Sequence, residues 1–488
     1  MSRPRQFHRG GCCAVILLLA GAPALAQEIQ FVAGSTTPRV QLTGEHFQMQ
    51  SDGVYFTAPT RGETLRRFGV LGTDLGLPLT VGDRVLFFFG DTVGAYPSGD
   101  RYYVSRGNPT GTGDSIGYLP NADFSACQYI RDVAQQLARG IRSPHGDTNG
   151  CPSLSFFLNP FRASDEHVFK PLVVTGLAAD ESQGTFRVPT GVVRHNDRVY
   201  VFVTTKMQDA QPVDAFWLQA SAAKSDQSPT LWSDTNPPSF TKLYTVSSHA
   251  TVADPANPPA IDEGAGKFMQ TPIVVMEAGR IADLGLARFL PAELQTSDVA
   301  FVFGVSWRAK ASNLYLAAFA MQDIEAGPSR WFYYAGNSRW SRTEQDAAGL
   351  LSANDVAHHS VTWNAALNRF VLMRGANGGR IVAQFAAAPW GPWSAPAVVF
   401  SPSDEWFPKL MHTPGADQIV QSLVPIFNRD GTRMELPDSE RGVPYGPSVL
   451  DRHTVNADGS VTLYYTLSTW NPYQTFLMSS TFRRATAR

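Results

Sequence analysis

Two aspartates on either side of one glycine turn are the residues of this chain whose type and spacing most clearly suggest chemistry. Asp74 lies eight positions before Gly82, and Asp91 lies eight positions after Asp83. The Gly82-Asp83 pair fits a two-residue type II′ turn, because glycine accepts a positive φ at the first central position. If this turn closes a regular hairpin, Asp74 and Asp91 are cross-strand partners whose carboxylates face each other at its open end.

A facing pair of carboxylates has two interpretations. Like charges opposite each other destabilise a hairpin, so folding alone gives no reason for the pair. Two carboxylates with separated pKa values are what acid/base hydrolysis of a glycosidic bond requires. The alternative is that each aspartate is solvated or caps nearby backbone amides, and the spacing by itself favours that alternative. Pro78 cannot donate a ladder hydrogen bond, so the register of the hairpin is expected to slip there if it slips at all.

The first 26 residues have the pattern of a secretory signal peptide. Three arginines precede an apolar run from Cys12 to Leu19, and Ala24-Leu25-Ala26 is a small-x-small cleavage site. The apolar run is too short for a lasting membrane span, and no other segment approaches 18 apolar residues. We therefore expect residues 27–488 to form a single exported domain that is secreted or periplasmic and has no stable membrane span.

The cysteines predict a disulfide, and the charge and composition indicate which classes of binding partner are expected. Cys127 and Cys151 are the two cysteines that lie beyond the signal peptide, and in an oxidising compartment they are expected to form a disulfide. The formal net charge is −2 and there are no basic blocks, which argues against a nucleic-acid partner. Charged residues make up 17% and aromatic residues 11% of the chain, a profile typical of exported β proteins that handle sugars.

Motifs for other chemistry are missing from the sequence. The two cysteines lack the additional cysteine and histidine neighbours that a zinc site needs. No P-loop, dinucleotide-binding fingerprint, HExxH helix or GxSxG elbow occurs in a supporting context. We therefore predict neither a metal nor a cofactor, and we expect a monomer with a polysaccharide substrate.

One strand pattern recurs five times and predicts the fold. Each copy is a polar turn followed by a strand of bulky residues, at uneven intervals. The copies are GDRVLFFFG from Gly82, NDRVYVFVT from Asn196, TSDVAFVFG from Thr296, ALNRFVLMR from Ala366 and ADGSVTLYYT from Ala457. Such repeats predict an all-β, five-bladed β-propeller, while a chain of two-sheet sandwiches is the competing fold. Residues 108–158 interrupt the pattern and predict a disulfide-stapled loop insertion that includes a helix.

The propeller would gather further residues around the aspartates. If each copy is the second strand of a blade, its end shares one face of the ring with the start of the preceding strand. Aromatic rings can cover the faces of sugars there, and polar side chains can bond to hydroxyl groups. The predicted substrate-binding residues are Thr92, Lys206, Trp307, Arg308, His358, Tyr445, Trp470 and Asn471.

These binding residues have structural alternatives. The two tryptophans can equally pack between blades, and the lysine and arginine can be solvated charges on the rim. His358 and His359 are consecutive on an expected strand, so at most one of them should face the channel. A histidine held by structural contacts is the commoner case.

Several segments together resemble the bacterial domain-of-unknown-function family 4185, from about Phe68 to Phe482. They are GTDLG at Gly72, FFGDT at Phe88, SVTWNAALNRFVLM at Ser360, APWGPWS at Ala388, YGPSVLDR at Tyr445 and LYYTLSTWNPYQ at Leu463. The resemblance implies a five-bladed propeller. For members with an assigned activity, it implies endo-acting hydrolysis of α-D-arabinofuranosyl linkages in mycobacterial arabinogalactan and lipoarabinomannan, with inversion expected. It places the catalytic aspartates at Asp74 and Asp91.

The chain departs from the family pattern at two positions near the expected mouth. His358 stands where the family has a glutamate, and Gln384 stands where an arginine is expected. The expected function is therefore an exported glycoside hydrolase acting on D-arabinan, a related furanoside or another polysaccharide, with the aspartate pair as general acid and base. The alternatives are a carbohydrate-binding propeller of the cell envelope that cuts nothing and a propeller with a purely structural role. Inversion requires carboxyl groups about 6.5–9.5 Å apart, whereas about 5 Å favours retention.

Overall fold

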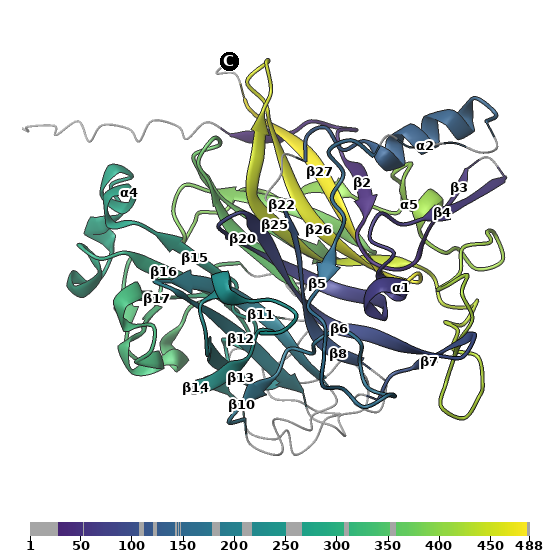
Figure 1. Ribbon diagram of the computed structural model, residues 1–488. Helices are drawn as coiled ribbons and strands as arrows, with labels where there is room; N and C mark the ends of the chain where they lie inside the picture. The colour runs from purple at the N-terminus through teal and green to yellow at the C-terminus, as the bar shows by residue number, and fades with distance from the viewer. Residues whose placement is uncertain are drawn as a thin grey trace, which may run out of the picture.

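Five β-sheets form a closed ring in the computed structural model (Figure 1). It describes residues 28–51, 53–106, 112–120, 124–141, 144, 146, 148–177, 186–206, 217–249, 266–306, 312–351 and 358–485, so the predicted signal peptide lies outside the described residues. The first strand of each sheet contacts the first strand of the next around the ring. The protein is thus a five-bladed β-propeller, as the repeats predicted, and each sheet is one blade.

The strands of the first three blades follow the chain in order from the centre of the ring outwards, except for one short earlier strand at the outer edge of blade 2. Blade 1 consists of β5 (Val70–Val81), β6 (Arg84–Ser98), β8 (Thr112–Pro120) and β9 (Ser155–Phe156). Blade 2 consists of β11 (Phe186–His195), β12 (Arg198–Lys206), β13 (Trp217–Ser225), β14 (Phe240–Ser248) and β10 (Val174–Thr175). Blade 3 consists of β15 (Ile273–Met276), β16 (Val299–Val305), β17 (Leu314–Ala320), β18 (Phe332–Tyr334) and β19 (Trp340–Ser341).

The last blade joins the two ends of the propeller. Blade 4 consists of β20 (His359–Asn364), β21 (Arg369–Ala376), β22 (Arg380–Ala386) and β23 (Ala397–Phe400). Blade 5 consists of β25 (Val443–Val455), β26 (Val461–Trp470), β27 (Gln474–Arg484), β1 (Ile29–Phe31) and β2 (Thr37–Gln41). Since β1 and β2 both pair with β27, early strands of the chain complete the blade that its last strands begin.

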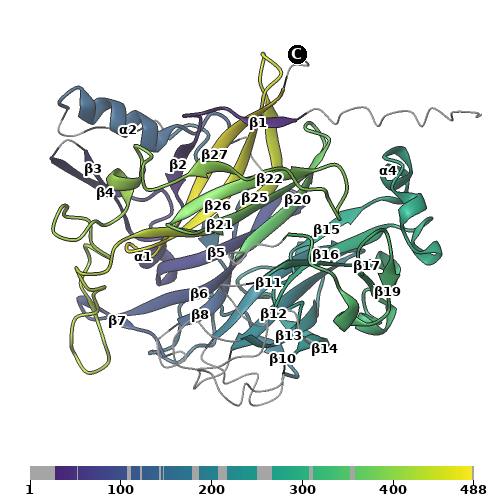
Figure 2. The same ribbon diagram turned by 180° about the vertical axis from the view of Figure 1, so that it is seen from behind.

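The remaining elements lie around the ring. The hairpin strands β3 (His46–Ser51) and β4 (Val54–Pro59) pair with each other, and β7 (Arg101–Val104) pairs with both β6 and β24 (Ile426–Phe427). The α-helices in the described segments are α1 (Thr64–Phe68), α2 (Tyr129–Ala138), α4 (Ala278–Asp283) and α5 (Phe407–Leu410). Figures 1 and 2 show α2 and α4 on opposite sides of the molecule, outside the blades. Within the described part of the chain, no helix has the length and apolar character needed to cross a membrane.

The five repeated segments are the second strands of the five blades, namely β6, β12, β16, β21 and β26. Such a strand is covered on both faces by neighbouring blades, which explains its unbroken run of bulky residues. On β6, Phe88 packs in the apolar cluster shared with blade 2, whereas Phe87 and Phe89 pack in the cluster shared with blade 5. Every residue of β16 is buried. The repeat is therefore the sequence signature of strands enclosed between two blades.

The predicted disulfide is present and holds a helix against blade 5. Cys127 and Cys151 are bonded, and the helix expected inside this loop is α2. Its buried face includes Ile130, Val133 and Leu137, which belong to the core cluster of blade 5. The helix contacts β2 and β3. The insertion thus covers the strands that complete the last blade.

The hairpin that carries both aspartates begins as predicted. Gly82 has a φ of 58° and Val81 pairs directly with Arg84, as a two-residue turn requires. Pro78 stays in register opposite Phe87, so the ladder does not slip at the proline. The register of the turn and of the outer half of the hairpin therefore follows from the glycine.

The predicted pairing of the two aspartates is wrong by one residue. After Leu77 the register shifts at Gly76, which has a φ of 73° and bulges out of β5. Asp74 consequently pairs with Gly90, and Asp91 falls in a second irregularity one position further along β6. The two acids still lie at the same end of the hairpin, but they are not direct cross-strand partners.

Candidate active site

Asp74 is buried at the inner end of blade 1, with 8% of its surface exposed. The hydroxyl group of Tyr445, on the first strand of blade 5, donates a hydrogen bond to its Oδ2 at 3.2 Å. The residue opposite Asp74 is Gly90, and a Cβ atom there would lie 2.8 Å from Asp74 Oδ1 and 2.9 Å from a methyl carbon of Val188. The glycine of the FGDT motif therefore leaves the space that the carboxyl group occupies.

Replacing Gly90 with alanine should displace the Asp74 carboxyl group and leave the propeller folded. The new methyl group would overlap a side-chain oxygen, which can rotate away more easily than a main-chain atom can. A catalytic group moved by about 1 Å can lose on the order of 100-fold in rate. We expect a loss of that order in kcat, measured on any glycan that the wild type cuts, with the melting temperature lowered only slightly. Full activity in the variant would contradict the placement of Asp74.

Asp91 lies in the irregular part of β6, where its backbone has a φ of 28°. Its side chain is half-buried. Its main-chain oxygen accepts a hydrogen bond of 3.0 Å from the hydroxyl group of Tyr473, which lies in the turn between β26 and β27. Aspartate tolerates the left-handed region better than most residues, but the conformation is still unusual and needs support.

The turn that carries Tyr473 fits directly onto β5. A side chain at Gly72 would overlap the carbonyl oxygen of Tyr473, so the first glycine of the GTDLG motif permits this approach. Gln474 Nε2 donates to the main-chain oxygen of Leu71 at 3.1 Å, and Tyr473 N donates to Gln421 Oε1 at 2.7 Å. The motifs from blades 1 and 5 are therefore in contact at one junction.

The pKa of Asp74 differs from that of an ordinary surface carboxylate. Burial raises the pKa of Asp74 to about 6, against hydrogen bonds from Tyr473 and Tyr445 that lower it. Burial also raises the pKa of both tyrosine hydroxyl groups, and the nearby negative charges of Asp74 and Asp91 raise it further. Both acids thus act on the same two hydroxyl groups.

His358 lies beside this group. Gln270 Nε2 donates a 3.4 Å hydrogen bond to its Nδ1, and its ring centroid is 6.2 Å from that of Tyr445. His358 and His359 are both among the residues that line one pocket. The expectation that they lie on one strand is wrong, because His358 has a φ of 36° and precedes β20, so strand alternation between the two does not apply. Burial lowers the pKa of His359 to about 3, which keeps it neutral.

Trp470 and Asn471 border the site at the end of β26. The indole ring of Trp470 is 37% exposed, packs edge-to-face on Tyr473 with centroids 5.6 Å apart, and donates from Nε1 to Glu440 Oε2 at 2.7 Å. Asn471 is buried, and its amide group donates to the main-chain oxygen of Glu440 at 2.6 Å. Trp470 is thus held with part of its ring open to solvent, while Asn471 supports the turn.

The other predicted binding residues are less informative. The Thr92 side chain is fully buried, and its hydroxyl group lies 2.6 Å from that of Ser115. Lys206 ends β12, opposite Trp217, and its side chain lies outside the described part of the structure. Residues Trp307 and Arg308 also lie outside it. The structure therefore brings together Asp74, Asp91, His358, Tyr445 and Trp470.

The second departure from the family pattern is not at the surface. Gln384 is buried on β22, accepts a hydrogen bond from Arg374 Nε at 3.2 Å and donates to the main-chain oxygen of Ser394 at 2.8 Å. Both the oxygen and the nitrogen of its side-chain amide therefore form hydrogen bonds within blade 4 and its following loop. Of the two departures, only His358 lies next to the acids.

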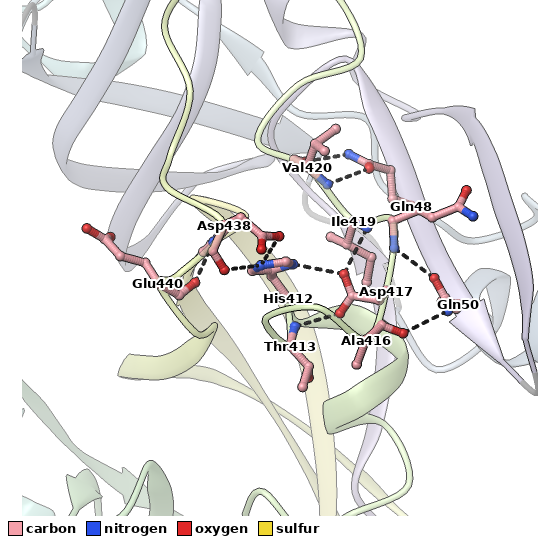
Figure 3. Close-up of polar contacts among 12 residues, drawn as sticks. Gln48, Gln50, His412, Thr413, Ala416, Asp417, Ile419, Val420, Asp438 and Glu440 are labelled. Carbon is pink, nitrogen blue, oxygen red and sulfur yellow. Dashed lines mark hydrogen bonds and ion pairs between the residues drawn. The ribbon is translucent and has the colours of Figure 1, made fainter.

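A segment that the sequence did not single out supports this side of the site. Residues 411–442, which we call the strap, run between α5 and β25. Figure 3 shows His412 between Asp417 and Asp438, with Nδ1 2.8 Å from the Asp417 carboxylate and Nε2 2.9 Å from the main-chain oxygen of Asp438. Burial lowers the pKa of His412, but these two partners raise it by more, so the net direction is upwards.

The strap is also hydrogen-bonded to β3. Gln48 exchanges two hydrogen bonds with the main chain of Val420, and Gln50 accepts one from the main chain of Gln418, as Figure 3 shows in part. The same strap carries Glu440, which holds Trp470. Among the described residues, no group of three His, Cys, Asp or Glu side chains is placed to bind a metal ion.

Sequence reasoning missed Tyr473 and Gly90, which complete the site. Tyr473 belongs to the STWNPY segment that carries the family resemblance, yet nothing in its spacing relates it to the aspartates about 380 residues earlier. Gly90 stands directly before Asp91, where a glycine is easily taken for a turn residue. Both residues lie in motifs that the sequence analysis quoted, but only their contacts in the structure show how they relate to the aspartates.

Comparison with solved structures finds matches at low identity. Matching structures include a protein of Bacteroides ovatus (10% identity, TM-score 0.44, covering 89% of this chain and 93% of that one). Two others are the catalytic domain of the Coprinopsis cinerea GH62 α-L-arabinofuranosidase (10% identity, TM-score 0.37, 93% and 99% covered) and an exo-1,5-α-L-arabinanase from a bovine ruminal metagenomic library (7% identity, TM-score 0.34, 85% and 95% covered). Such remote likenesses carry no argument about substrate or residues.

The sequence itself gives a firmer relationship. No curated protein matches it. Residues 60–479, which run from before β5 into β27 and so leave out β1 and β2 of blade 5, match the family described as "Domain of unknown function (DUF4185)". The match covers well over half of the chain and contains both motifs that meet at the junction of blades 1 and 5. This protein therefore belongs to the DUF4185 family.

Proposed function

We propose that this protein is an exported glycoside hydrolase that cuts D-arabinan or a related furanoside polysaccharide, with Asp74 as the general acid and Asp91 as the general base. The observation that carries the proposal is the unequal environment of the two acids. Asp74 is buried and has a pKa raised to about 6, whereas Asp91 is half-buried at the same end of the hairpin. Two carboxyl groups whose surroundings separate their pKa values are the arrangement that glycosidic hydrolysis uses.

The roles follow from protonation. At mildly acidic pH a carboxyl group with a pKa near 6 is still partly protonated and can donate its proton to the glycosidic oxygen as the bond to the anomeric carbon breaks. Asp91 would take a proton from a water molecule whose oxygen attacks that carbon from the opposite side. One fragment leaves with a new hydroxyl group and the other carries the added water oxygen. Asp74 ends ionised and Asp91 ends protonated, and exchange with solvent restores both.

The remaining neighbours suit a sugar ligand. The exposed part of Trp470 offers an aromatic face beside the acids, and His358 offers a ring nitrogen close to Tyr445. His358 occupies the position of a family glutamate, so we expect the subsite next to Tyr445 to differ from that of D-arabinan-cutting members. The proposal of export rests on the N-terminal sequence, and the proposal of a furanoside rests on the family resemblance.

Incubation of the purified mature protein with D-arabinan and a panel of other polysaccharides tests the proposal. We expect oligosaccharides to be released, as detected by mass spectrometry, and early NMR spectra to show the inverted anomer. Asp74→Asn and Asp91→Asn should each abolish release. Equal release by either variant would contradict the assignment of the pair. Glycan binding by the wild type without any release would instead support a carbohydrate-binding propeller.

A further inference from the structure

We propose that Tyr445 and Tyr473 are positioning residues that bridge the two acids: Tyr445 orients the Asp74 carboxyl group, and Tyr473 holds the main chain of Asp91. The inference rests on the proposed function, since it concerns how the same acid pair is kept in place. Both tyrosines come from blade 5, whereas both acids come from blade 1. The bridge therefore spans the junction between the first and last blades.

Tyr445 acts on the carboxyl group itself. Its hydroxyl group has one proton, which it donates to Asp74 Oδ2 at 3.2 Å. A hydrogen bond of this kind is stronger to a carboxylate than to a neutral acid, so it opposes the effect of burial on Asp74. It also selects one rotation of the carboxyl group, because only Oδ2 receives it. The bond thus influences both the direction and the ionisation of the acid.

Tyr473 acts on the backbone. Its hydroxyl group donates to the Asp91 main-chain oxygen at 3.0 Å, while its own main chain is fixed by Gln421 and its ring is packed by Trp470. A left-handed conformation is unfavourable for a residue such as aspartate, so Asp91 keeps it only while its surroundings require it. Without the hydroxyl group, the backbone of Asp91 loses this restraint and its carboxyl group can move.

A merely structural role for the tyrosines is the alternative, and position in the blade does not exclude it. Buried tyrosines elsewhere in blade 5 do have that role. Tyr465 on β26 is fully buried and its hydroxyl group lies 3.1 Å from that of Ser480. Tyr465 therefore provides a matched control: it is the same residue type in the same blade, with a buried hydroxyl group and no contact with either acid among those described.

The test compares Tyr445→Phe, Tyr473→Phe and Tyr465→Phe in pH profiles of kcat and KM on a glycan that the wild type cuts. The high-pH limb reports the loss of the proton from the general acid. Tyr445→Phe should move this limb upwards by about one pH unit, because a bond that favours the ionised acid is gone. Tyr473→Phe should move it in the same direction, because the Tyr473 hydroxyl group also lowers the pKa of Asp74, and should lower kcat by on the order of 10- to 100-fold. Tyr465→Phe should leave the limb in place.

A second measurement needs no substrate, so it tests the positioning role of the tyrosines separately from the proposed glycoside hydrolase activity. Carbon-13 NMR of aspartate-labelled protein, with the Asp74 signal assigned by its loss in Asp74→Asn, follows the titration of that carboxyl group directly. Tyr445→Phe should raise the midpoint and Tyr465→Phe should not. If no glycan is cut but the midpoint moves, the proposed function fails while the orienting contact stands. Unchanged midpoints together with unchanged pH profiles in both active-site variants would overturn the inference.

Discussion

Replacing Asp74 with asparagine is expected to abolish glycan cleavage and, at the same time, to stabilise the folded protein above pH 6. Removal of a general acid typically costs about 100- to 10,000-fold in rate. The gain in stability follows from the buried carboxyl group, whose pKa is 3.8 in a free chain and about 6 in the fold. Between these values the folded protein binds more protons than the unfolded chain, so stability falls as the pH rises.

The stability gained by Asp74→Asn depends on pH. At pH 8 the carboxylate is ionised in both states, and its burial opposes folding by about 3 kcal/mol. Asparagine carries no charge to desolvate, so the variant should melt about 3 °C above the wild type at pH 8. Near pH 3.5 the difference should vanish, since the wild-type acid is then largely protonated in both states. Calorimetric melting at the two pH values measures both expectations.

Asp83→Asn is the control for this experiment, because Asp83 lies exposed in the turn of the same hairpin. It should change neither the activity nor the pH dependence of melting by a comparable amount. A lower melting temperature for Asp74→Asn at pH 8 would show that the carboxylate is stabilised by its surroundings. In that case Asp74 could not be the acid of the pair.

Gly72→Ala should damage both the fold and the activity. The added methyl group would overlap the carbonyl oxygen of Tyr473, a main-chain atom that cannot rotate away. Blades 1 and 5 would have to separate locally, at a cost of about 3 kcal/mol or more in the free energy of unfolding. The hydrogen bond from Tyr473 to Asp91 would be lost as well, so we expect little or no cleavage. Denaturant unfolding and the glycan assay measure the two effects.

Gly279→Ala provides the comparison for this variant. Gly279 lies in α4 on the outside of the ring, and a Cβ atom there meets no neighbour within 4 Å. Alanine favours a helix over glycine by up to about 1 kcal/mol, so this substitution should be neutral or slightly stabilising. If Gly72→Ala behaved in the same way, the close contact between the GTDLG and STWNPY segments would be wrong.

The blades could be predicted from the sequence because their signal is local and repeated. A strand enclosed between two blades needs bulky residues on both faces, and a polar turn must precede it, so each second strand leaves the same pattern within ten residues. The order of strands then places Asp74 and Asp91 at one end of blade 1. The hairpin and the family motifs were therefore sufficient to propose Asp74 and Asp91 as the acid pair.

The finer geometry could not be predicted because it depends on contacts between distant segments. The bulge at Gly76 moves Asp74 opposite Gly90, and nothing in the pattern of β5 distinguishes that glycine from one in an ordinary strand. The strap has no repeat, and its anchors pair Gln48 with Val420, 372 residues apart. Tyr473 reaches Asp91 across 382 residues. Such pairs have no periodic signature in a single sequence.

The closure of the ring also sets the order in which the site can be assembled during synthesis. The acids belong to the first blade, while the tyrosines that contact them belong to the last. Several hundred further residues must therefore be synthesised before these contacts can form. Until then Asp74 lacks the hydrogen bond from Tyr445 and the burial that blade 5 provides. The proposed cleaving activity is therefore expected only after the final blade has docked against the first.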